Sequence, residues 1–180
     1  SDKDYVEPSA GSGVFIDSYK KITNLTNIQG YDINPHREDI IEQNWLSISK
    51  DKVKDRIVVG NPPFGFAASL AIKFFNKAAE LDAHAIGFIV PKTFRKQSVH
   101  NKLDLNYKNV VDINLPKNAF FFYEKDNEFY DVPTVFQIWK RDTTNPRKLV
   151  DMLSTSKHFT FVTKDSEFDV CVRRAGGKAG

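Results

Sequence analysis

The chain alternates between short continuous apolar runs and a segment in which apolar residues recur at helical spacing. Runs over 57–60 and 85–91 have the length of strands, and a further strand is predicted over 110–115, where Asp112 and Asn114 interrupt the apolar residues. The run over 85–91 is typical of a strand that is buried on both faces of a sheet. Between the first two runs, apolar residues return every three or four positions, which predicts a helix with one face toward the core. The residues of this stripe are Phe66, Leu70, Phe74, Ala78 and Leu81.

The same alternation continues on both sides of these runs. Short strands are predicted over 5–7 and 30–32, and Asn34 is suited to cap a helix after the second of them. A basic helix is predicted over 93–105. Residues 133–140 alternate inward and outward, as an edge or hairpin strand does. The pattern as a whole predicts an α/β fold.

The first predicted strand ends in an acid and runs into a loop of small residues that opens a helix. Glu7 ends the strand, and residues 8–13 read Pro-Ser-Ala-Gly-Ser-Gly. Glycines let a backbone approach a ligand closely and present amides at a helix N-terminus. The third glycine of a dinucleotide fingerprint would fall at Ile16, and no Gly-Lys-Ser/Thr follows as in a P-loop. A second acid, Asp32, ends the next strand, where sheets of this kind bind ribose hydroxyls.

A turn after the strand at 57–60 has the chemistry to hold a flat amine. The Asn61 side-chain carbonyl and the Pro62 backbone carbonyl can each accept one N–H of an exocyclic amino group. Pro62 and Pro63 stiffen the turn, and Phe64 offers a ring on which a planar group can stack. A purely structural reading, a strand that ends in a rigid Pro-Pro turn with an aromatic cap, is disfavoured by the loop at the start of the chain.

Together these residues resemble the S-adenosylmethionine-dependent amino-methyltransferases, in particular the adenine-N6 DNA methyltransferases of restriction-modification systems. The resemblance implies a Rossmann-like fold with a mostly parallel seven-stranded sheet and an antiparallel edge strand. It implies that the Asn-Pro-Pro-Phe turn is catalytic, which assigns that role to Asn61, Pro62, Pro63 and Phe64. It implies S-adenosylmethionine as cofactor, with these residues around it: Glu7, Pro8, Ala10, Gly11, Gly13, Asp32, Ile33, Asn44, Trp45 and Asn61.

The reaction implied by the resemblance is direct in-line transfer of methyl to the N6 amine of adenine in DNA. The target base must swing out of the duplex to reach the site. Three alternatives stay open at this point. The acceptor is an amino group of adenine or guanine in RNA, or a protein glutamine, or the chain is a non-catalytic subunit with a cofactor fold that serves an active partner.

Composition and charge agree with an enzyme of this kind. At 180 residues and 41% apolar, the chain can form one sizeable core, and no apolar run approaches the roughly 20 residues that span a bilayer. Cys171 is the only cysteine and the four histidines lack metal-ligand spacing, so we expect a cytoplasmic protein without a metal. The segment 92–117 holds six Lys and Arg against two Asp. Its first three basic residues are predicted to bind the substrate by contacting phosphates: Lys92, Arg95 and Lys96. The alternative is that this segment is only a solvated surface.

The predicted domain organisation is a methyltransferase domain over 1–145 and a C-terminal extension over 146–180. The expected partner is nucleic acid, DNA before RNA. The extension is short for a region that reads a DNA sequence, so either a further chain or a missing segment supplies target recognition, or the substrate is not a specific DNA site. Aromatic residues over 119–123 are expected in the core or at a hairpin apex rather than as a stacking platform for bases.

Overall fold

The computed structural model describes residues 3–24, 26–117, 119, 132–151, 157–163 and 165–171. The chain divides into two compact units, Ser1–Val150 and Asp151–Gly180. The described helices and strands all belong to the first unit. Of the aromatic segment over 119–123 only Ala119 is described, and the basic tail from Arg173 onward lies outside the described residues.

The first unit is built on a sheet that has seven strands among the described residues. Their order across the sheet is β3-β2-β1-β4-β5-β7-β6. The first five pair in parallel, whereas β7 is antiparallel to both of its neighbours, β5 and the edge strand β6. The predicted α/β fold with a mostly parallel seven-stranded sheet and antiparallel pairing at one edge is confirmed. The strands are β1 (Tyr5–Glu7), β2 (Ile28–Asp32), β3 (Ile40–Glu42), β4 (Ile57–Gly60), β5 (Ala85–Pro91), β6 (Tyr107–Asn114) and β7 (Thr134–Arg141).

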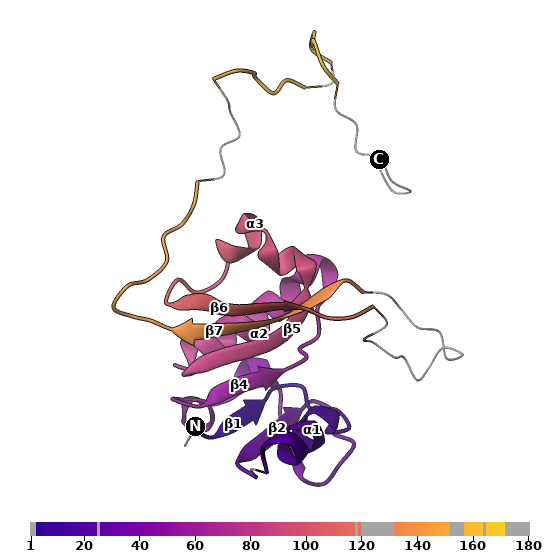
Figure 1. The fold of residues 1–180 in the computed structure, drawn as a ribbon, viewed down its shortest axis with the longest axis vertical. Helices are drawn as coiled ribbons and strands as arrows, with labels where there is room; N and C mark the ends of the chain where they lie inside the picture. The colour runs from indigo at the N-terminus through magenta and orange to yellow at the C-terminus, as the bar shows by residue number, and fades with distance from the viewer. Residues whose placement is uncertain are drawn as a thin grey trace, which may run out of the picture. The chain divides into compact units, whose positions relative to one another are not determined.

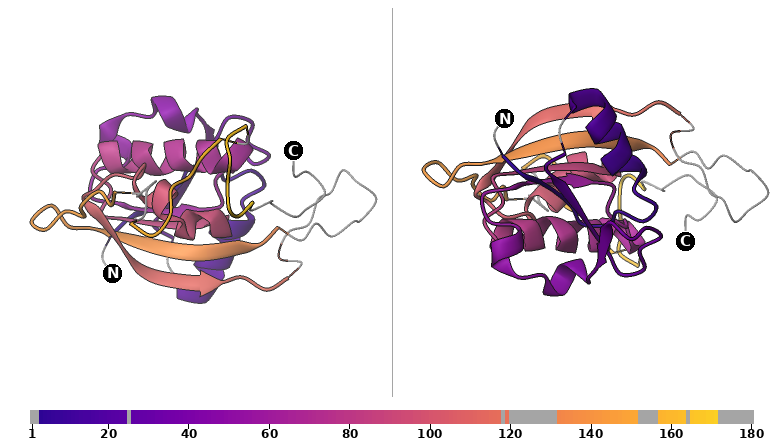
Figure 2. Two further views of the ribbon diagram at one scale, coloured as in Figure 1. Left: turned by 90° about the horizontal axis from the view of Figure 1, so that it is seen from above. Right: turned by 90° about the horizontal axis from the view of Figure 1, so that it is seen from below.

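Helices lie on both faces of this sheet. Helix α1 (Val14–Thr23) covers one face, and α2 (Ser69–Glu80) and α3 (Gln97–His100) cover the other (Figures 1 and 2). None of the helices in the described part of the chain is long and apolar enough to cross a membrane. In the described ranges, four short 3₁₀ turns complete the elements: η1 (Trp45–Ser47), η2 (Lys50–Lys52), η3 (Phe66–Ala68) and η4 (Lys92–Arg95).

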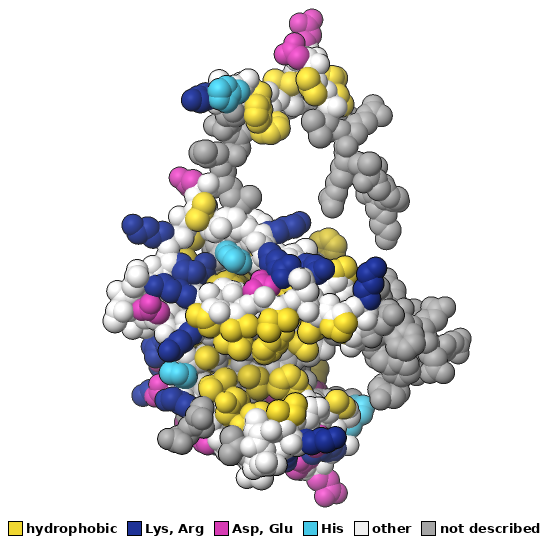
Figure 3. Space-filling view, in the orientation of Figure 1, with side chains coloured by type: hydrophobic (Ala, Val, Ile, Leu, Met, Phe, Trp, Pro, Cys, Tyr) yellow, Lys and Arg dark blue, Asp and Glu magenta, His cyan; other side chains and the backbone are white. Residues whose placement is uncertain are grey.

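Two hydrophobic clusters hold the layers together. The larger one lies between the sheet and α2, where Phe75 makes edge-to-face contacts with Trp139 and Tyr107. The smaller one lies under α1, where Ile16 packs against Ile28 and its neighbours on the opposite face. Hydrophobic side chains also form a band across the sheet on the face that Figure 3 shows.

The predicted basic helix over 93–105 is wrong in extent. The segment forms η4 and the single turn of α3, separated by Lys96 in an extended conformation. Its later carbonyls are used elsewhere, because the Arg147 guanidinium donates to the backbone oxygens of His100, Leu103 and Asp104. Tertiary hydrogen bonds therefore replace the helical ones. They also tie Arg147, which the prediction placed in the C-terminal extension, to the first unit.

Two further local predictions fail. No helix follows Asn34, because its amide donates to Asp32 Oδ1 at 2.9 Å and the chain turns directly into β3. The apolar stripe begins later than predicted: α2 starts at Ser69, and Phe66 lies outside it with 92% of its surface exposed. The rest of the stripe faces inward, with Phe74, Ala78 and Leu81 buried and Leu70 packed against the core.

Candidate active site

The polar residues predicted to form the site lie at the carboxyl ends of three neighbouring strands. β1 lies between β2 and β4 and pairs in parallel with both, so Glu7, Asp32 and Asn61 follow the same edge of the sheet. Neighbouring strands are about 4.8 Å apart. The loop after β1 and the turn after β4 are also bonded to each other directly, because the Ser9 hydroxyl donates to the Asn61 backbone carbonyl at 3.1 Å.

Glu7 is a buried carboxyl group that lacks a full set of partners. Only 3% of the residue is exposed, and none of the described residues donates a hydrogen bond to its Oε2 atom. Burial, together with the nearby Asp32 carboxylate and against the opposing effect of Arg37, raises the pKa of Glu7 to about 8. Glu7 is therefore mostly protonated at neutral pH in the ligand-free protein.

Gly60 brings the end of β4 against this carboxyl group. Its φ of 152° is one that L side chains rarely adopt, and a Cβ there would lie 3.1 Å from Glu7 Cγ. A side chain at position 60 would therefore press on the buried acid. The close approach explains why the apolar run of β4 ends in glycine just before the Asn-Pro-Pro-Phe turn.

The Asp32 carboxylate accepts backbone amides from the small-residue loop and from its own turn. Its Oδ2 atom accepts the Gly11 amide at 2.8 Å, and its Oδ1 atom accepts the Asn34 amide at 2.9 Å. Each carboxylate oxygen can accept a second hydrogen bond, so the predicted contacts with ribose hydroxyls remain chemically open. Asp32 is half-buried.

The Arg37 side chain donates hydrogen bonds to the carbonyls of the same loop, a role that the sequence did not reveal. Its Nη1 atom donates to the carbonyls of Ser12 at 3.4 Å and Gly13 at 3.3 Å and forms an ion pair with Asp17 at 2.8 Å. Its other edge forms two hydrogen bonds with the Asp39 carboxylate, at 2.9 and 2.7 Å. A Cβ at Gly13 would lie only 2.3 Å from Arg37 Nη1, so the loop and the guanidinium fit together closely.

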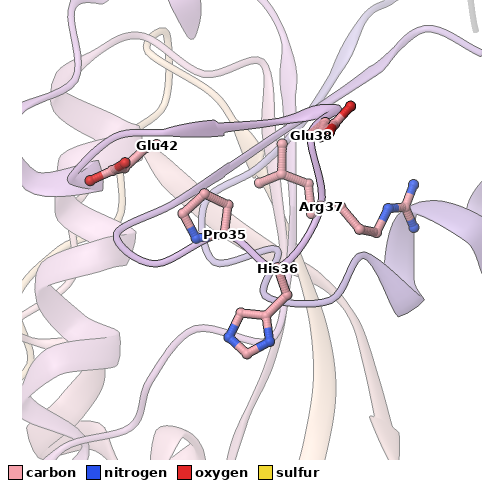
Figure 4. A pocket seen from close by; sticks show the side chains of 6 residues that line it. Pro35, His36, Arg37, Glu38 and Glu42 are labelled. Atoms are coloured by element: carbon pink, nitrogen blue, oxygen red, sulfur yellow. The ribbon is translucent and has the colours of Figure 1, made fainter.

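A shallow depression lies on the connection between β2 and β3, beside this clamp. In Figure 4 the Arg37 side chain extends away from the His36 ring. The depression contains none of the predicted cofactor residues, although the His36 amide reaches the Gly11 carbonyl at 3.1 Å. It is lined by Pro35, His36, Arg37, Glu38, Ile40 and Glu42.

The two predicted acceptors of the Asn-Pro-Pro-Phe turn differ in exposure. Asn61 is exposed and Pro62 is buried, and no donor within the described ranges reaches the Asn61 side-chain amide or the Pro62 carbonyl. The first turn of α2 fixes the end of the Asn-Pro-Pro-Phe turn, because the Phe64 carbonyl accepts the amides of Leu70 at 3.1 Å and Ala71 at 3.3 Å. Within the described residues, the Asn61 side-chain carbonyl and the Pro62 backbone carbonyl therefore both keep their acceptor capacity.

The predicted cofactor contacts of Ile33, Asn44 and Trp45 are only partly presented. Ile33 is 70% exposed beside Asp32, so its side chain is open to a ligand. Asn44 caps η1, since its Oδ1 atom accepts the Leu46 amide at 2.9 Å, and this oxygen keeps one further acceptor site. Trp45 is 1% exposed and its indole N–H donates to the Phe74 carbonyl at 3.1 Å. This placement makes Trp45 a core residue, contrary to the prediction that it contacts the cofactor.

The three predicted substrate-binding cations differ in their surroundings. Lys92 and Lys96 are exposed. Arg95 is engaged: its guanidinium forms an ion pair with Asp112 and donates to Asn114 at 3.0 Å, and the pair lowers the pKa of the Asp112 carboxyl. Lys92 and Lys96 remain suited to phosphate contacts, whereas Arg95 would have to leave its partners first.

The residues present fit S-adenosylmethionine. A buried carboxyl oxygen without a donor suits the positive charge of the ligand, and Gly11, with a φ of 50° and open space where a Cβ would be, lets a ligand approach the backbone. Nothing comparable points to a metal. The described residues contain no group of three His, Cys, Asp or Glu that could hold one.

Comparisons with known proteins relate the chain to methyltransferases. A family model described as the EDM2 methyltransferase-like domain matches residues 14–144. The chain is 30% identical over 126 residues to the Protein ENHANCED DOWNY MILDEW 2 of Arabidopsis thaliana, a match that covers 63% of this chain and 10% of that protein. The chain therefore spans about a tenth of the length of this curated relative.

Solved structures show the same fold at low identity. A putative RNA methyltransferase from Pyrococcus horikoshii has a TM-score of 0.56 at 14% identity, over 78% of this chain and 75% of that chain. The M protein of the type I restriction enzyme EcoKI has a TM-score of 0.55 at 19% identity, over 89% of this chain and 47% of that chain. These likenesses establish a methyltransferase fold.

Proposed function

The chain belongs to the family of the EDM2 methyltransferase-like domain, and we propose that it transfers a methyl group from S-adenosylmethionine to the N6 amine of adenine in DNA. One observation carries the proposal. The acid of the cofactor loop, the acid of the second strand and the Asn-Pro-Pro-Phe turn lie at the ends of three adjacent parallel strands, with the Ser9–Asn61 hydrogen bond joining the first and the last.

In this proposal the cofactor side of the site binds and orients the donor. The amides and carbonyls of the loop over 8–13 take the methionine part, with Glu7 as the partner of its positive charge. Asp32 and Ile33 take the ribose and one face of the adenine. When bound, S-adenosylmethionine supplies an electrophilic methyl group on sulfur.

The acceptor side positions the amine. The lone pair of an exocyclic amine is delocalised into the base, so the amine is a poor nucleophile until its geometry changes. Asn61 and the Pro62 carbonyl accept its two N–H groups and direct the lone pair toward the methyl carbon. The C–N bond forms as the C–S bond breaks, and one proton then leaves the nitrogen. Asn61 is not basic enough to take that proton earlier, so positioning provides most of the rate.

In this proposal the ring of Phe64 stacks on the flipped base. The exposed Lys92 and Lys96 bind phosphates of the nucleic acid backbone. RNA remains the second candidate, because the fold is also that of a putative RNA methyltransferase. A protein amide is the third, and a non-catalytic subunit is disfavoured by the intact acceptors of Asn61 and Pro62. We propose that a partner chain supplies the recognition of the target sequence.

The proposal is tested by following tritiated methyl transfer to duplex DNA, single-stranded DNA, total RNA and a Gly-Gly-Gln peptide in parallel. Digestion of labelled nucleic acid to nucleosides then identifies the product. We expect N6-methyladenine in DNA, and labelling about a hundredfold slower with the Asn61→Ala variant. Label confined to RNA or to the peptide would overturn the choice of DNA, and failure of the folded protein to bind S-adenosylhomocysteine would overturn the proposed function itself.

A further inference from the structure

Phe66 is the most exposed large hydrophobic residue in the described part of the chain. It lies two residues after Phe64, in η3, and 92% of its surface is accessible. The spacing of apolar residues predicted that it would begin the buried face of α2. Leaving a phenyl ring in water forgoes the gain of burial, so its position calls for a physical reason.

The backbone around Phe66 is what keeps the ring out of the core. Gly65, Ala67 and Ala68 have φ values of 67°, 50° and 63°. This left-handed conformation is unfavourable for alanine, and backbone strain of this kind clusters at functional sites. The Gly65 carbonyl also accepts the Ala68 amide at 3.3 Å. The strained turn is therefore held in one conformation and delays the start of α2.

The surroundings of the ring are basic. The turn η3 contacts η4, which follows β5 and carries Lys92, with Lys96 directly after it. Both lysines are exposed, while the intervening Arg95 is paired with Asp112. An exposed aromatic residue beside unengaged positive charge is the combination that binds single-stranded nucleic acid, with bases stacked on rings and phosphates held by cations.

We propose that Phe66 is a second stacking site, which binds the nucleobase next to the target base while Lys92 and Lys96 bind the intervening phosphate. The inference rests on the proposed function and narrows the substrate to a nucleic acid strand with an unstacked base. Phe64 and Phe66 are two residues apart, so their Cα atoms are separated by at most about 7 Å, a distance that adjacent nucleotides can bridge. A base that leaves the stack exposes the face of its neighbour, and Phe66 replaces the lost contact.

The test measures binding of a fluorescein-labelled single-stranded oligodeoxynucleotide by anisotropy, with S-adenosylhomocysteine affinity measured by calorimetry on the same proteins. Phe66→Ala should weaken oligonucleotide binding by about tenfold and leave cofactor affinity unchanged. Phe66→Trp should retain oligonucleotide binding, whereas Phe66→Leu should weaken it as Phe66→Ala does, because leucine is apolar but has no π face. Ile22→Ala is the matched control, since Ile22 is 80% exposed on α1.

Salt dependence separates stacking from charge. Lys92→Gln and Lys96→Gln should each lower the slope of log affinity against log salt by about 0.7 on a single strand, whereas Phe66→Ala should leave that slope unchanged. Normal oligonucleotide affinity of Phe66→Ala, or full rescue by leucine, would overturn the inference. Cofactor binding without oligonucleotide binding would overturn it too and leave a methyltransferase for another substrate. Absence of cofactor binding would instead refute the proposed function.

Discussion

Binding of S-adenosylmethionine should release a proton from Glu7. The carboxyl group is buried beside Asp32 and has a pKa of about 8, so it is neutral in most ligand-free molecules at pH 7. The ligand brings positive charge to the buried Oε2 atom, which favours the ionised carboxylate. The described neighbours that influence this equilibrium are Asp32, which favours the proton, and Arg37, which opposes it.

The expected amount follows from the pKa. A group with a pKa of about 8 carries about 0.9 proton at pH 7 and about 0.1 proton at pH 9, so binding should release nearly one proton at the lower pH and almost none at the higher. The sulfonium is the charge that S-adenosylhomocysteine lacks. We therefore expect a smaller release with the product than with the cofactor.

Calorimetric titration in buffers of different ionisation enthalpy measures this number. At pH 7 the observed binding enthalpy should change with the buffer in the wild-type protein and become almost independent of it in Glu7→Gln. Asp32→Asn should give an intermediate release, because it removes the negative charge that helps to keep Glu7 protonated. Binding of S-adenosylmethionine with no buffer dependence at pH 7, or with the same dependence in Glu7→Gln, would refute the reasoning.

Four further predictions follow from the contacts. Because the native pKa of Glu7 lies above the unfolded value, the free energy of unfolding of the ligand-free protein should fall as the pH rises from about 4.5 to 8, by up to about 1.4 kcal/mol per pH unit. Thermal melts should show a melting temperature that depends less on pH in Glu7→Gln. Asp32→Ala removes the acceptor of the Gly11 amide and of the proposed ribose hydroxyls, so calorimetry should show a loss of cofactor affinity of more than tenfold, about 1.5–3 kcal/mol. Asn61→Ala should slow single-turnover methyl transfer about a hundredfold with little change in cofactor affinity, and retention of the full rate would exclude the carbonyl-pair mechanism. Arg147→Ala should lower the free energy of unfolding in urea by about 2–4 kcal/mol, because four backbone carbonyls lose a charged donor; a loss below about 0.5 kcal/mol would contradict this.

The order of strands and loops was readable from the sequence because it depends on local chemistry. Short apolar runs gave β4 and β5, and an acid at the end of each of the first two strands marked the edge where ligands bind. Asn61, Pro62, Pro63 and Phe64 are contiguous, so the turn they form and the acceptors it contains follow from four neighbouring residues. These features need no knowledge of what packs against them.

The surroundings of each site residue were decided only by the tertiary structure. Asn44 and Trp45 are adjacent, yet one caps a surface turn and the other is buried against Phe74. The pairing of Arg95 with Asp112 crosses 17 positions of the chain, and the Arg37 clamp joins a loop more than 20 positions away. Helical spacing predicted a buried Phe66, but a strained turn that only the folded backbone shows leaves it in solvent.

The difference has a common physical reason. Periodicity and turn chemistry are properties of neighbours in the sequence, whereas burial, ion pairing and pKa depend on which distant groups arrive at the same place. The sequence by itself therefore determined the fold class and the Asn-Pro-Pro-Phe turn of this protein. Only the packing of the strands decided that Glu7 would be neutral, that Arg95 would be engaged and that Phe66 would face the solvent.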